Sequence, residues 1–487
     1  MVLESTGLPF ARQTSLVRPE TQADEAARTK AVKLSMNDCA MPRMYTRLLY
    51  FWPPEASHVL QDTPALLNSL SCFLSYYPML AGQLTTLSDG SLQVTMDPAS
   101  DCVPFCTVTT NEATYASLEA TGFDPMQFPA ATPFVPVDLF PAPVPELGLP
   151  PLRVPLFLAQ VTHFADGGAV LGTVFHHALL DGRATFAAVA AWGKLHTSPQ
   201  TVPATLHDRS ALNAITAASE APVECDMYMS QIQTIAAAQR PGESETSEAA
   251  ASACMPQMQG RLLKFSDAEL ASIKAAAVAA LDTSSVPWIS TADALGAHVW
   301  RAATRARHKA GLLAALEADQ TLRLGFAVDA RRRLDPPLPL EYCGNANIYG
   351  VATAPLSLLL DKSAAAAAAA AAVVRRAVNR VTYEHCAQAL AWVAAQPEKA
   401  RIQPSFNSFL GPDWAITSWS GFKDAYAVDF GAGKPARVRL PGADFDGLMI
   451  VFPRAPGDGG LEVLMGLTVA AWECLDSDAS FRQWREM

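Results

Sequence analysis

Charged residues are scarce in this sequence, and basic residues are scarcer than acidic ones. Only 17% of the 487 residues are charged, the formal net charge at pH 7 is −11, and Lys and Arg form no cluster. Nucleic-acid binding is therefore not expected as a main role, because phosphate backbones are bound by gathered basic side chains. Half of the residues are apolar, which predicts large cores and argues against disorder.

Long apolar runs and paired cysteines are also missing. The uniformly apolar stretch at 364–374 is shorter than the roughly 20 residues of a membrane helix, and residues 1–10 lack the pattern of a signal peptide. The nine cysteines are scattered, and Cys102 and Cys106 have no second pair with which to complete a zinc site. We expect a cytoplasmic protein with reduced thiols, no metal site and no membrane span.

One short stretch, Phe175-His-His-Ala-Leu-Leu-Asp-Gly182, gathers residues that carry chemistry. A strand-like run at 169–175 precedes it and a helical run at 184–195 follows it. The histidines are therefore expected at the end of a strand, and the aspartate at the N-cap of a helix, since Asp is a favoured N-cap residue. Side chains on a loop between a strand and a helix are often placed in clefts.

The residue types in this stretch suit proton transfer. A neutral His177 can take a proton from a hydroxyl or an amine at cellular pH. Asp181, four residues later, either orients the imidazole or turns away and holds the loop. His176 points to the opposite side of the strand and is interpreted as structural. A His and an Asp at this spacing are weak evidence alone, and a buried structural pair is the alternative interpretation.

Apolar periodicity predicts alternating strands and helices in both halves of the chain, so the fold class is α/β. The connecting residues 197–255 are rich in Ser, Glu and Ala near their end and predict a linker. Expected strands are 46–52, a hairpin of 155–164 and 169–175, and then 260–265, 323–328, 414–419, 438–440, 447–452 and 461–467. Expected helices follow Gly182 and occupy 267–281, 294–310 and 364–382.

Nearly end to end, the chain resembles the BAHD acyltransferases, which move an acyl group from coenzyme A to a hydroxyl or an amine. His176–Gly182 matches the family's HHxxxDG, and Asp429-Phe-Gly-Ala-Gly433 stands where the family carries DFGWG. Weaker matches follow in the family's order: Tyr50-Phe-Trp-Pro-Pro54, Tyr76-Tyr-Pro-Met-Leu-Ala-Gly82, Asp208-Arg-Ser210, Tyr342-Cys-Gly-Asn345 and Thr417-Ser-Trp419.

The resemblance implies a fold of two similar lobes, like chloramphenicol acetyltransferase, each a mixed β-sheet flanked by helices. The expected division is an N-terminal lobe at 1–200 with HHxxxDG, a crossover linker at 201–255, and a C-terminal lobe at 256–487 with the DFGAG segment. His177 is expected midway along a channel between the lobes, which acyl-CoA enters from one face and the acceptor from the other.

Roles for further residues follow from the same resemblance. Asp181 is expected to point away from the substrate and to pair with Arg331, because an unpaired buried carboxylate would be costly. Thr417 and Trp419 are expected near the oxyanion of the tetrahedral intermediate, on the acceptor side.

The DFGAG segment is expected on the coenzyme side, with Asp429, Gly431 and Gly433 as binding residues. The family's tryptophan is Ala432 here, which removes much buried surface. Either a neighbouring side chain fills the space or coenzyme binding is altered.

The expected activity is transfer of a hydroxycinnamoyl or another aromatic or aliphatic acyl group from acyl-CoA to a small alcohol or amine, with His177 as general base in a ternary complex. No permanently bound cofactor and a monomer are expected. One alternative is a non-catalytic accessory protein of fatty-acid elongation, with which Ala432 is consistent but against which the intact His177 argues. A condensation domain, which shares HHxxxDG, ranks last because the chain carries no carrier module. Arg401 is a candidate for binding an acceptor carboxylate. Tyr50–Trp52 suit either an aromatic acyl group or the core.

Overall fold

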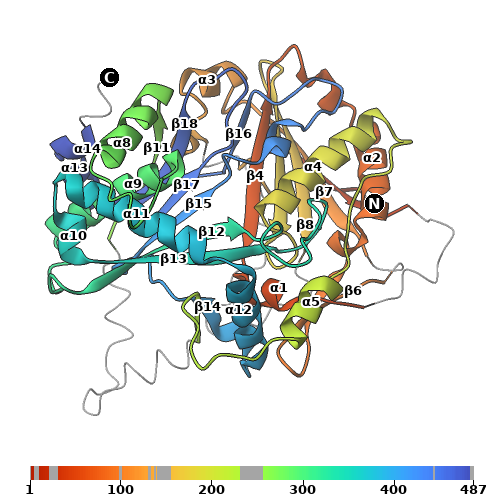
Figure 1. Cartoon of the computed structure of the whole chain (residues 1–487). Coiled ribbons are helices and arrows are strands. Elements are labelled where there is room, and N and C mark those ends of the chain that lie inside the picture. Colours follow the sequence, from red (N-terminus) through yellow and green to blue (C-terminus); the bar gives the residue numbers. More distant parts are fainter. Residues whose placement is uncertain are drawn as a thin grey trace, which may run out of the picture.

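The structure, a computed structural model, describes residues 2–4, 10–20, 31–97, 101–129, 133–136, 139, 155–230, 256–442 and 445–482 (Figure 1). The second half of the expected linker, residues 231–255, lies outside the described residues. Two sheets stand side by side, with helices on their outer faces and a third group of short helices below them (Figure 1).

The first sheet has seven strands in the order β1-β2-β7-β8-β9-β4-β16. β7 and β8 are parallel and the other neighbours are antiparallel, so the sheet is mixed, as expected. The predicted strand at 46–52 and the predicted hairpin are confirmed as β4 and as β8 with β9. The bounds are β1 Val2–Glu4, β2 Arg12–Val17, β4 Tyr45–Trp52, β7 Val103–Thr110, β8 Phe157–Phe164, β9 Ala169–His176 and β16 Arg437–Arg439.

The second sheet has six strands in the order β11-β18-β17-β15-β12-β13, and it is mixed because β15 runs parallel to both β12 and β17. The sequence analysis missed β13, although its side chains alternate between buried and accessible positions. The bounds are β11 Met258–Phe265, β12 Thr321–Asp329, β13 Asn347–Pro355, β15 Trp414–Ser418, β17 Leu448–Val451 and β18 Leu461–Thr468. Two small sheets add β3 Val32–Lys33, β5 Gln83–Thr86, β6 Leu92–Thr95, β10 Tyr228–Ser230 and β14 Ile402–Pro404.

Helices cover each sheet and begin at recognisable caps. In α8 and α9 the side chains of Ser266 and Ser290 accept from the third helical N–H, and Glu269 and Asp293 complete capping boxes. The alanine tract forms the first half of α11, and Ala370, Ala371 and Ala372 pack into the hydrophobic core of the second lobe. The helix bounds are α1 Met36–Ala40, α2 Thr63–Tyr76, α3 Tyr115–Ala120, α4 Gly182–Thr197, α5 Ser210–Ala217, α8 Asp267–Ala279, α9 Thr291–Lys309, α10 Leu356–Leu360, α11 Ala364–Arg380, α12 Tyr383–Ala395, α13 Val469–Asp476 and α14 Ala479–Arg482.

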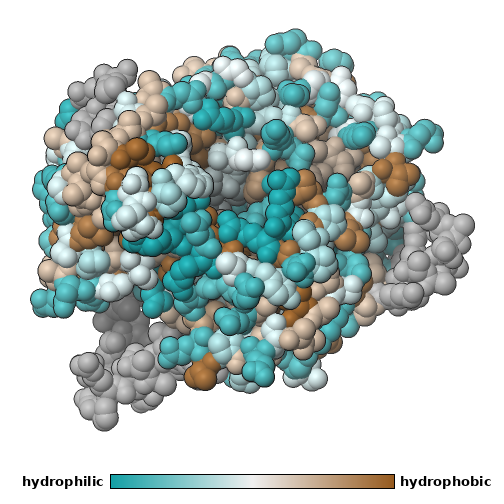
Figure 2. Space-filling model, viewed as in Figure 1, coloured by the Kyte–Doolittle hydropathy of each residue, from teal (hydrophilic) through white to brown (hydrophobic). Residues whose placement is uncertain are grey.

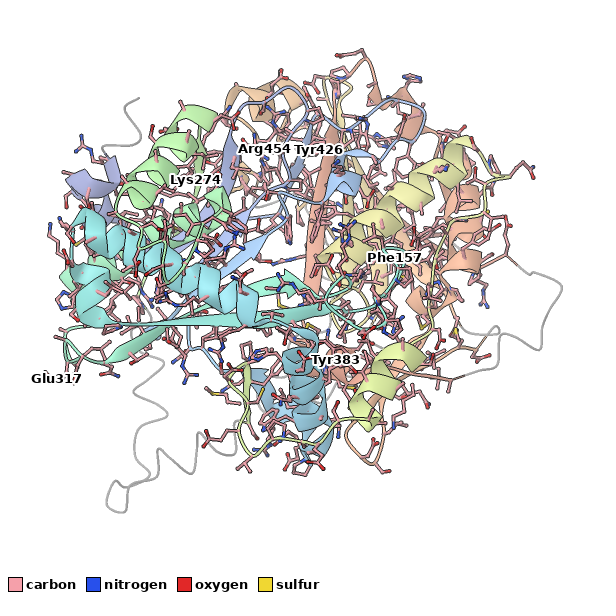
Figure 3. The ribbon with its side chains drawn as sticks, in the orientation of Figure 1. Phe157, Lys274, Glu317, Tyr383, Tyr426 and Arg454 are labelled. Carbon is pink, nitrogen blue, oxygen red and sulfur yellow. The ribbon has the colours of Figure 1, made fainter. Side chains whose placement is uncertain are left out.

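The C-terminal half contributes one strand to the first sheet. β16 comes from the C-terminal half but pairs with β4 at the edge of the first sheet. Tyr426, which lies between the lobes (Figure 3), is buried, and its hydroxyl accepts the N–H of Val438 in β16. The start of the expected linker is also structured, because α5 and β10 lie within it and β10 pairs with β14. The residue boundaries of the lobes stay a prediction.

Although half of the residues are apolar, the surface in view is largely polar. Hydrophilic side chains cover much of the face seen in Figure 2, and the apolar patches on it are small and separate. Among the helices that the structure describes, none combines the length and the apolarity that crossing a membrane requires.

Candidate active site

A cavity of about 890 Å³ lies between the two sheets. The first lobe lines it with the start of β4 and the turn that leads from β9 into α4, and the second lobe lines it with β12, β13, β15 and β17. Its charged and histidine lining residues are Arg47, His177, Asp181, Arg183, Asp329 and Arg331, and its aromatic ones are Tyr45, Phe326, Tyr349, Phe406, Trp419, Phe422 and Phe445.

His177 follows directly after β9, and hydrogen bonds fix its backbone on both sides. Its N–H donates to the carbonyl oxygen of Met44 at 2.8 Å, and its own carbonyl oxygen accepts from Nδ2 of Asn345 at 2.9 Å. Ring atom Nδ1 is buried without a hydrogen-bond partner in the described chain, while the residue lines the cavity. This leaves Nε2 as the ring nitrogen that a substrate can reach.

His176 lies on the other side of the strand, as a strand's alternation requires. It is buried, its ring meets Tyr45 edge-on with centroids 5.4 Å apart, and its Nδ1 accepts the N–H of Ala178 at 3.3 Å. Burial, together with the nearby charges of Arg43 and His177, lowers the pKa of His176 to about 3. A neutral, packed ring agrees with the structural interpretation.

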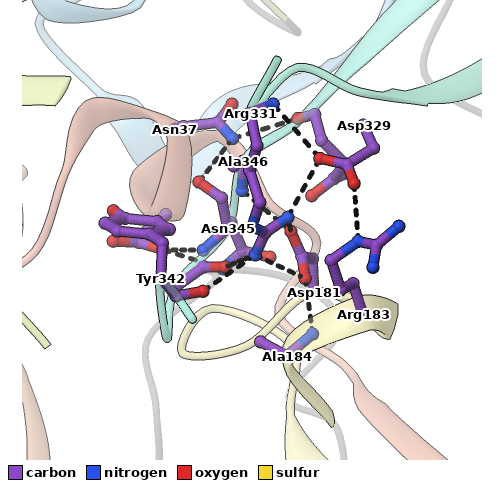
Figure 4. Close-up of polar contacts among 12 residues, drawn as sticks. Asn37, Asp181, Arg183, Ala184, Asp329, Arg331, Tyr342, Asn345 and Ala346 are labelled. Atoms are coloured by element: carbon purple, nitrogen blue, oxygen red, sulfur yellow. Dashed lines mark hydrogen bonds and ion pairs between the residues drawn. The ribbon is translucent and has the colours of Figure 1, made fainter. Parts of the chain in front are cut away.

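Asp181 faces Arg331 and Ala184 and holds the loop (Figure 4), which decides between the two orientations that the sequence left open. Its carboxylate accepts from both terminal nitrogens of Arg331, at 2.8 and 3.1 Å, and from the N–H groups of Ala184 and Ala346, each at 2.9 Å. It is therefore both the N-cap of α4 and one half of a buried ion pair between the lobes.

Arg331 is completely buried, and both of its terminal nitrogens make hydrogen bonds. Besides Asp181 it donates to Asp329 at 3.1 Å and to the carbonyl oxygens of Tyr342 and Gly344. Burial alone would lower the pKa of Arg331, but the two carboxylates beside it raise the pKa above its ordinary value. The guanidinium therefore stays charged and ties the loop before α4 to the second lobe.

A second polar group, missed by the sequence reasoning, supports the backbone of His177. Asn345 bonds the carbonyl of His177 and also donates to Oδ1 of Asp38 at 2.8 Å. Asp38 in turn forms a buried ion pair with Arg209 at 3.1 Å. Asn345 and Arg209 lie in the segments Tyr342–Asn345 and Asp208–Ser210, which both match the family weakly. Those two matches are the signal from which the sequence could have placed both residues near His177.

Thr417 and Trp419 both line the cavity. The Trp419 ring packs edge-on against Phe186, with centroids 5.7 Å apart, and its indole N–H makes no hydrogen bond within the described chain. A Cβ added at Gly182 would lie 3.2 Å from Nε1 of Trp419 and 3.1 Å from Phe422. The glycine that ends HHxxxDG thus lets the indole lie close to the start of α4.

The DFGAG segment lies against α4 and β4, and none of its residues lines the cavity. Oδ1 of Asp429 accepts the N–H groups of Gly431 and Gly433, at 2.7 and 2.9 Å, and both glycines have positive φ. Phe430 packs edge-on against Trp192, with centroids 5.1 Å apart. These contacts hold a loop, and coenzyme binding by Asp429, Gly431 and Gly433 stays a prediction.

Two further candidates lie elsewhere. Arg401 pairs with Glu398 three residues away and does not line the cavity. Tyr50, Phe51 and Trp52 are completely buried in the cores of the first lobe, so they contribute packing and no cavity wall. No cluster of three or more His, Cys, Asp or Glu side chains that could hold a metal occurs among the described residues.

The Transferase family profile matches residues 12–482. The chain belongs to this family, the BAHD acyltransferases. It is a coenzyme A-dependent acyltransferase, with acyl-CoA as a co-substrate. Within this BAHD acyltransferase, the HHxxxDG segment supplies the turn, the N-cap and the cavity-facing imidazole described above.

Relatives and solved structures extend over almost the whole chain. A hydroxycinnamoyl-CoA:5-hydroxyanthranilate N-hydroxycinnamoyltransferase of Avena sativa is 28% identical, covering 93% of this chain and 96% of its own. The shikimate O-hydroxycinnamoyltransferase of Nicotiana tabacum is 26% identical, covering 93% and 96%. The fold matches F. graminearum TRI101, solved with coenzyme A and deoxynivalenol, at a TM-score of 0.73 and 19% identity over 93% of this chain and 98% of that one. Vinorine synthase matches at 0.61 and 16% identity, over 97% and 96%.

Proposed function

We propose that this protein transfers a hydroxycinnamoyl or closely related aromatic acyl group from coenzyme A to a hydroxyl or an amine of a small acceptor, with His177 as general base. The observation that carries the proposal is the reachable Nε2 of His177 in a cavity between the two lobes. The named activities of the Avena and Nicotiana relatives, an N- and an O-hydroxycinnamoyltransferase, support the acyl group and both kinds of acceptor atom.

The composition of the cavity wall supports a planar aromatic acyl group. Phe326, Tyr349 and Phe406 come from the second lobe, and Tyr349 and Phe406 meet edge-on with centroids 5.5 Å apart. Aromatic rings favour offset or edge-on contacts with another ring, beyond the gain from burying its area. A cinnamoyl ring can make such contacts, whereas an acetyl group cannot.

The reaction follows as a direct transfer. The acceptor oxygen or nitrogen attacks the thioester carbonyl while Nε2 of His177 takes its proton. The resulting oxyanion lies near the Trp419 indole N–H and the Thr417 hydroxyl, which stabilise it as donors. When the intermediate collapses the C–S bond breaks, and protonated His177 returns the proton to the leaving thiolate, whose conjugate thiol has a pKa of about 8–9. Neither a metal nor a covalent enzyme intermediate takes part in this sequence.

Release of free thiol tests the proposal. Coumaroyl-, acetyl-, malonyl- and long-chain acyl-CoA are offered with a panel of alcohols and amines to wild type and to His177→Ala. We expect thiol release with coumaroyl-CoA, and a loss of roughly 10²–10⁴-fold in the variant, the usual contribution of a general base. His58→Ala removes an exposed histidine and serves as the control.

Equal rates for wild type and His177→Ala would end the assignment of the base. No turnover with any donor would favour the non-catalytic alternative instead. In the same assay, Asp429→Ala tests the coenzyme side: a raised KM for acyl-CoA with unchanged kcat supports contact with the coenzyme, and unchanged kinetics with lower stability support a loop that is only structural.

A further inference from the structure

Arg47 is a basic residue inside the cavity, on the wall of the first lobe. It lies on β4, where Tyr45 is paired with His176 and Arg47 with Val174. His177, one residue beyond His176, donates its N–H to Met44, so Arg47 lies three residues, or about 10 Å, along the strand from the level of His177. A ligand group at Arg47 and a reacting atom at His177 can therefore belong to one small molecule.

The positive and negative side chains that line the cavity do not balance, because Arg47 has no acidic partner among them. Arg183 pairs with Asp329 at 2.6 Å, and Arg331 pairs with Asp181 at 2.8 Å and with Asp329 at 3.1 Å. Both lining carboxylates are thereby used. Arg47 has no hydrogen bond and no ion pair with any residue that the structure describes. The cavity thus carries one uncompensated positive charge in a protein whose net charge is −11.

An unpaired guanidinium in such a place has an energetic cost. Burial lowers the pKa of Arg47, and no acid offsets this. Burying a charge is unfavourable unless it is paired. Nothing in the fold that the structure describes uses Arg47 as a partner, so its charge is available to a ligand. The planar fork of a guanidinium can donate two parallel hydrogen bonds to the two oxygens of a carboxylate, and it matches phosphate in the same way.

We propose that Arg47 binds a carboxylate carried by the acceptor, and so selects acidic alcohols or amines. The assignment to the acceptor rests on the proposed function, because a hydroxycinnamic acid loses its free carboxylate when it forms the thioester. Arg401, the other arginine considered for this role, lies outside the cavity and is paired with Glu398. Arg47 acts on binding and specificity and takes no part in bond breaking.

A matched pair of ligands tests the inference without requiring turnover. The dissociation constants of 3-hydroxybenzoate and its neutral isostere 3-hydroxybenzamide are measured by calorimetry on wild type, Arg47→Met, Arg47→Lys and the control Arg401→Met. A charge-assisted hydrogen bond contributes about 1.5–3 kcal/mol, so wild type and Arg401→Met should prefer the carboxylate by roughly 10–100-fold. Arg47→Met should lose this preference, and Arg47→Lys should keep part of it.

Kinetics with the same variants locate the carboxylate. With coumaroyl-CoA as donor, kcat/KM is measured for an acidic acceptor and for its methyl ester. Arg47→Met should lower the ratio of the value for the acid to that for the ester by roughly 10-fold or more, mainly by raising KM for the acid. If the variant instead changes only the ratio of malonyl-CoA to acetyl-CoA with a neutral acceptor, the carboxylate belongs to the acyl group and the assignment to the acceptor is overturned.

Other outcomes separate this inference from the proposed function. Equal preference for the carboxylate in wild type and Arg47→Met overturns the role of Arg47, whatever the activity. A preference that depends on Arg47 in a protein without any acyl transfer supports the carboxylate site and refutes the proposed function. A purely structural Arg47 would show itself as a lower unfolding temperature in Arg47→Met, whereas removal of an unpaired, half-buried charge should leave that temperature unchanged or raise it.

Discussion

The ion pair of Asp181 with Arg331 should be strongly coupled, because both partners are buried and each satisfies the other. The side chain of Arg331 is 0% exposed and that of Asp181 is 5% exposed. Asp181→Ala would leave a buried guanidinium with Asp329 and two carbonyl oxygens, and would leave the N–H groups of Ala184 and Ala346 without their acceptor.

The magnitude follows from these contacts. Removing one partner of a buried ion pair costs about 3–5 kcal/mol, and loss of an N-cap side chain about 1 kcal/mol, which is partly contained in the first figure. We expect Asp181→Ala to lower the free energy of unfolding by about 4 kcal/mol. Arg331→Met should cost about 3 kcal/mol, since the carboxylate keeps two backbone donors.

A double-mutant cycle is the appropriate assay. Urea unfolding, followed by circular dichroism, is measured for wild type, both single variants and the double variant. Because the second substitution removes a charge that the first has already isolated, the double variant should lose at least about 2 kcal/mol less than the sum of the single losses. Arg454→Met, at an exposed pair with Asp267, is the control and should change stability by less than about 1 kcal/mol.

Additive losses, within about 0.5 kcal/mol, would refute the reasoning, since they would mean that the pair contributes no mutual stabilisation. Asp181→Asn gives an independent check on orientation. If Asp181 oriented the imidazole, this variant would lower kcat with little loss of stability, whereas the observed geometry predicts that lost stability accompanies any lost activity.

Three further predictions concern the same cavity. Trp419→Phe keeps the packing but removes the indole N–H, so kcat should fall by roughly 10-fold or more with little change in KM. The indole N–H of Trp52 donates to the carbonyl oxygen of a loop, so the control Trp52→Phe should lower stability instead. Gly182→Ala places a methyl group 3.1–3.2 Å from two rings and should lower kcat. Gly421 also lines the cavity, but a Cβ added there meets no atom within 4 Å, so Gly421→Ala should leave kcat unchanged. A steady-state assay compares the two variants. The folded-state pKa of His176 is about 3, below its unfolded value, so the unfolded chain binds the extra proton as pH falls. The contribution of His176 to stability should therefore drop by about 2 kcal/mol between pH 6.5 and 4.5, and His176→Asn should reduce the pH dependence of urea unfolding in that range by this amount.

Local sequence was sufficient for the parts of the site that neighbouring residues decide. The change from strand to turn to helix around His177 follows from apolar periodicity and an aspartate N-cap, whose interactions span only a few residues. The alternation of strands, the placement of His176 opposite His177 and the capping boxes of α8 and α9 have the same local origin. The DFGAG and HHxxxDG segments were also sufficient to indicate the family.

Only the tertiary structure decided how distant segments meet. Asp181 and Arg331 are 150 residues apart, so the sequence left open which way the carboxylate turns. β16 joins the first sheet although it belongs to the C-terminal half, and Arg401 lies outside the cavity although it is near Thr417 in sequence. Whether a half-buried charge such as Arg47 has a partner depends on every surface packed around it. The path of the whole chain settles this, and periodicity or capping does not.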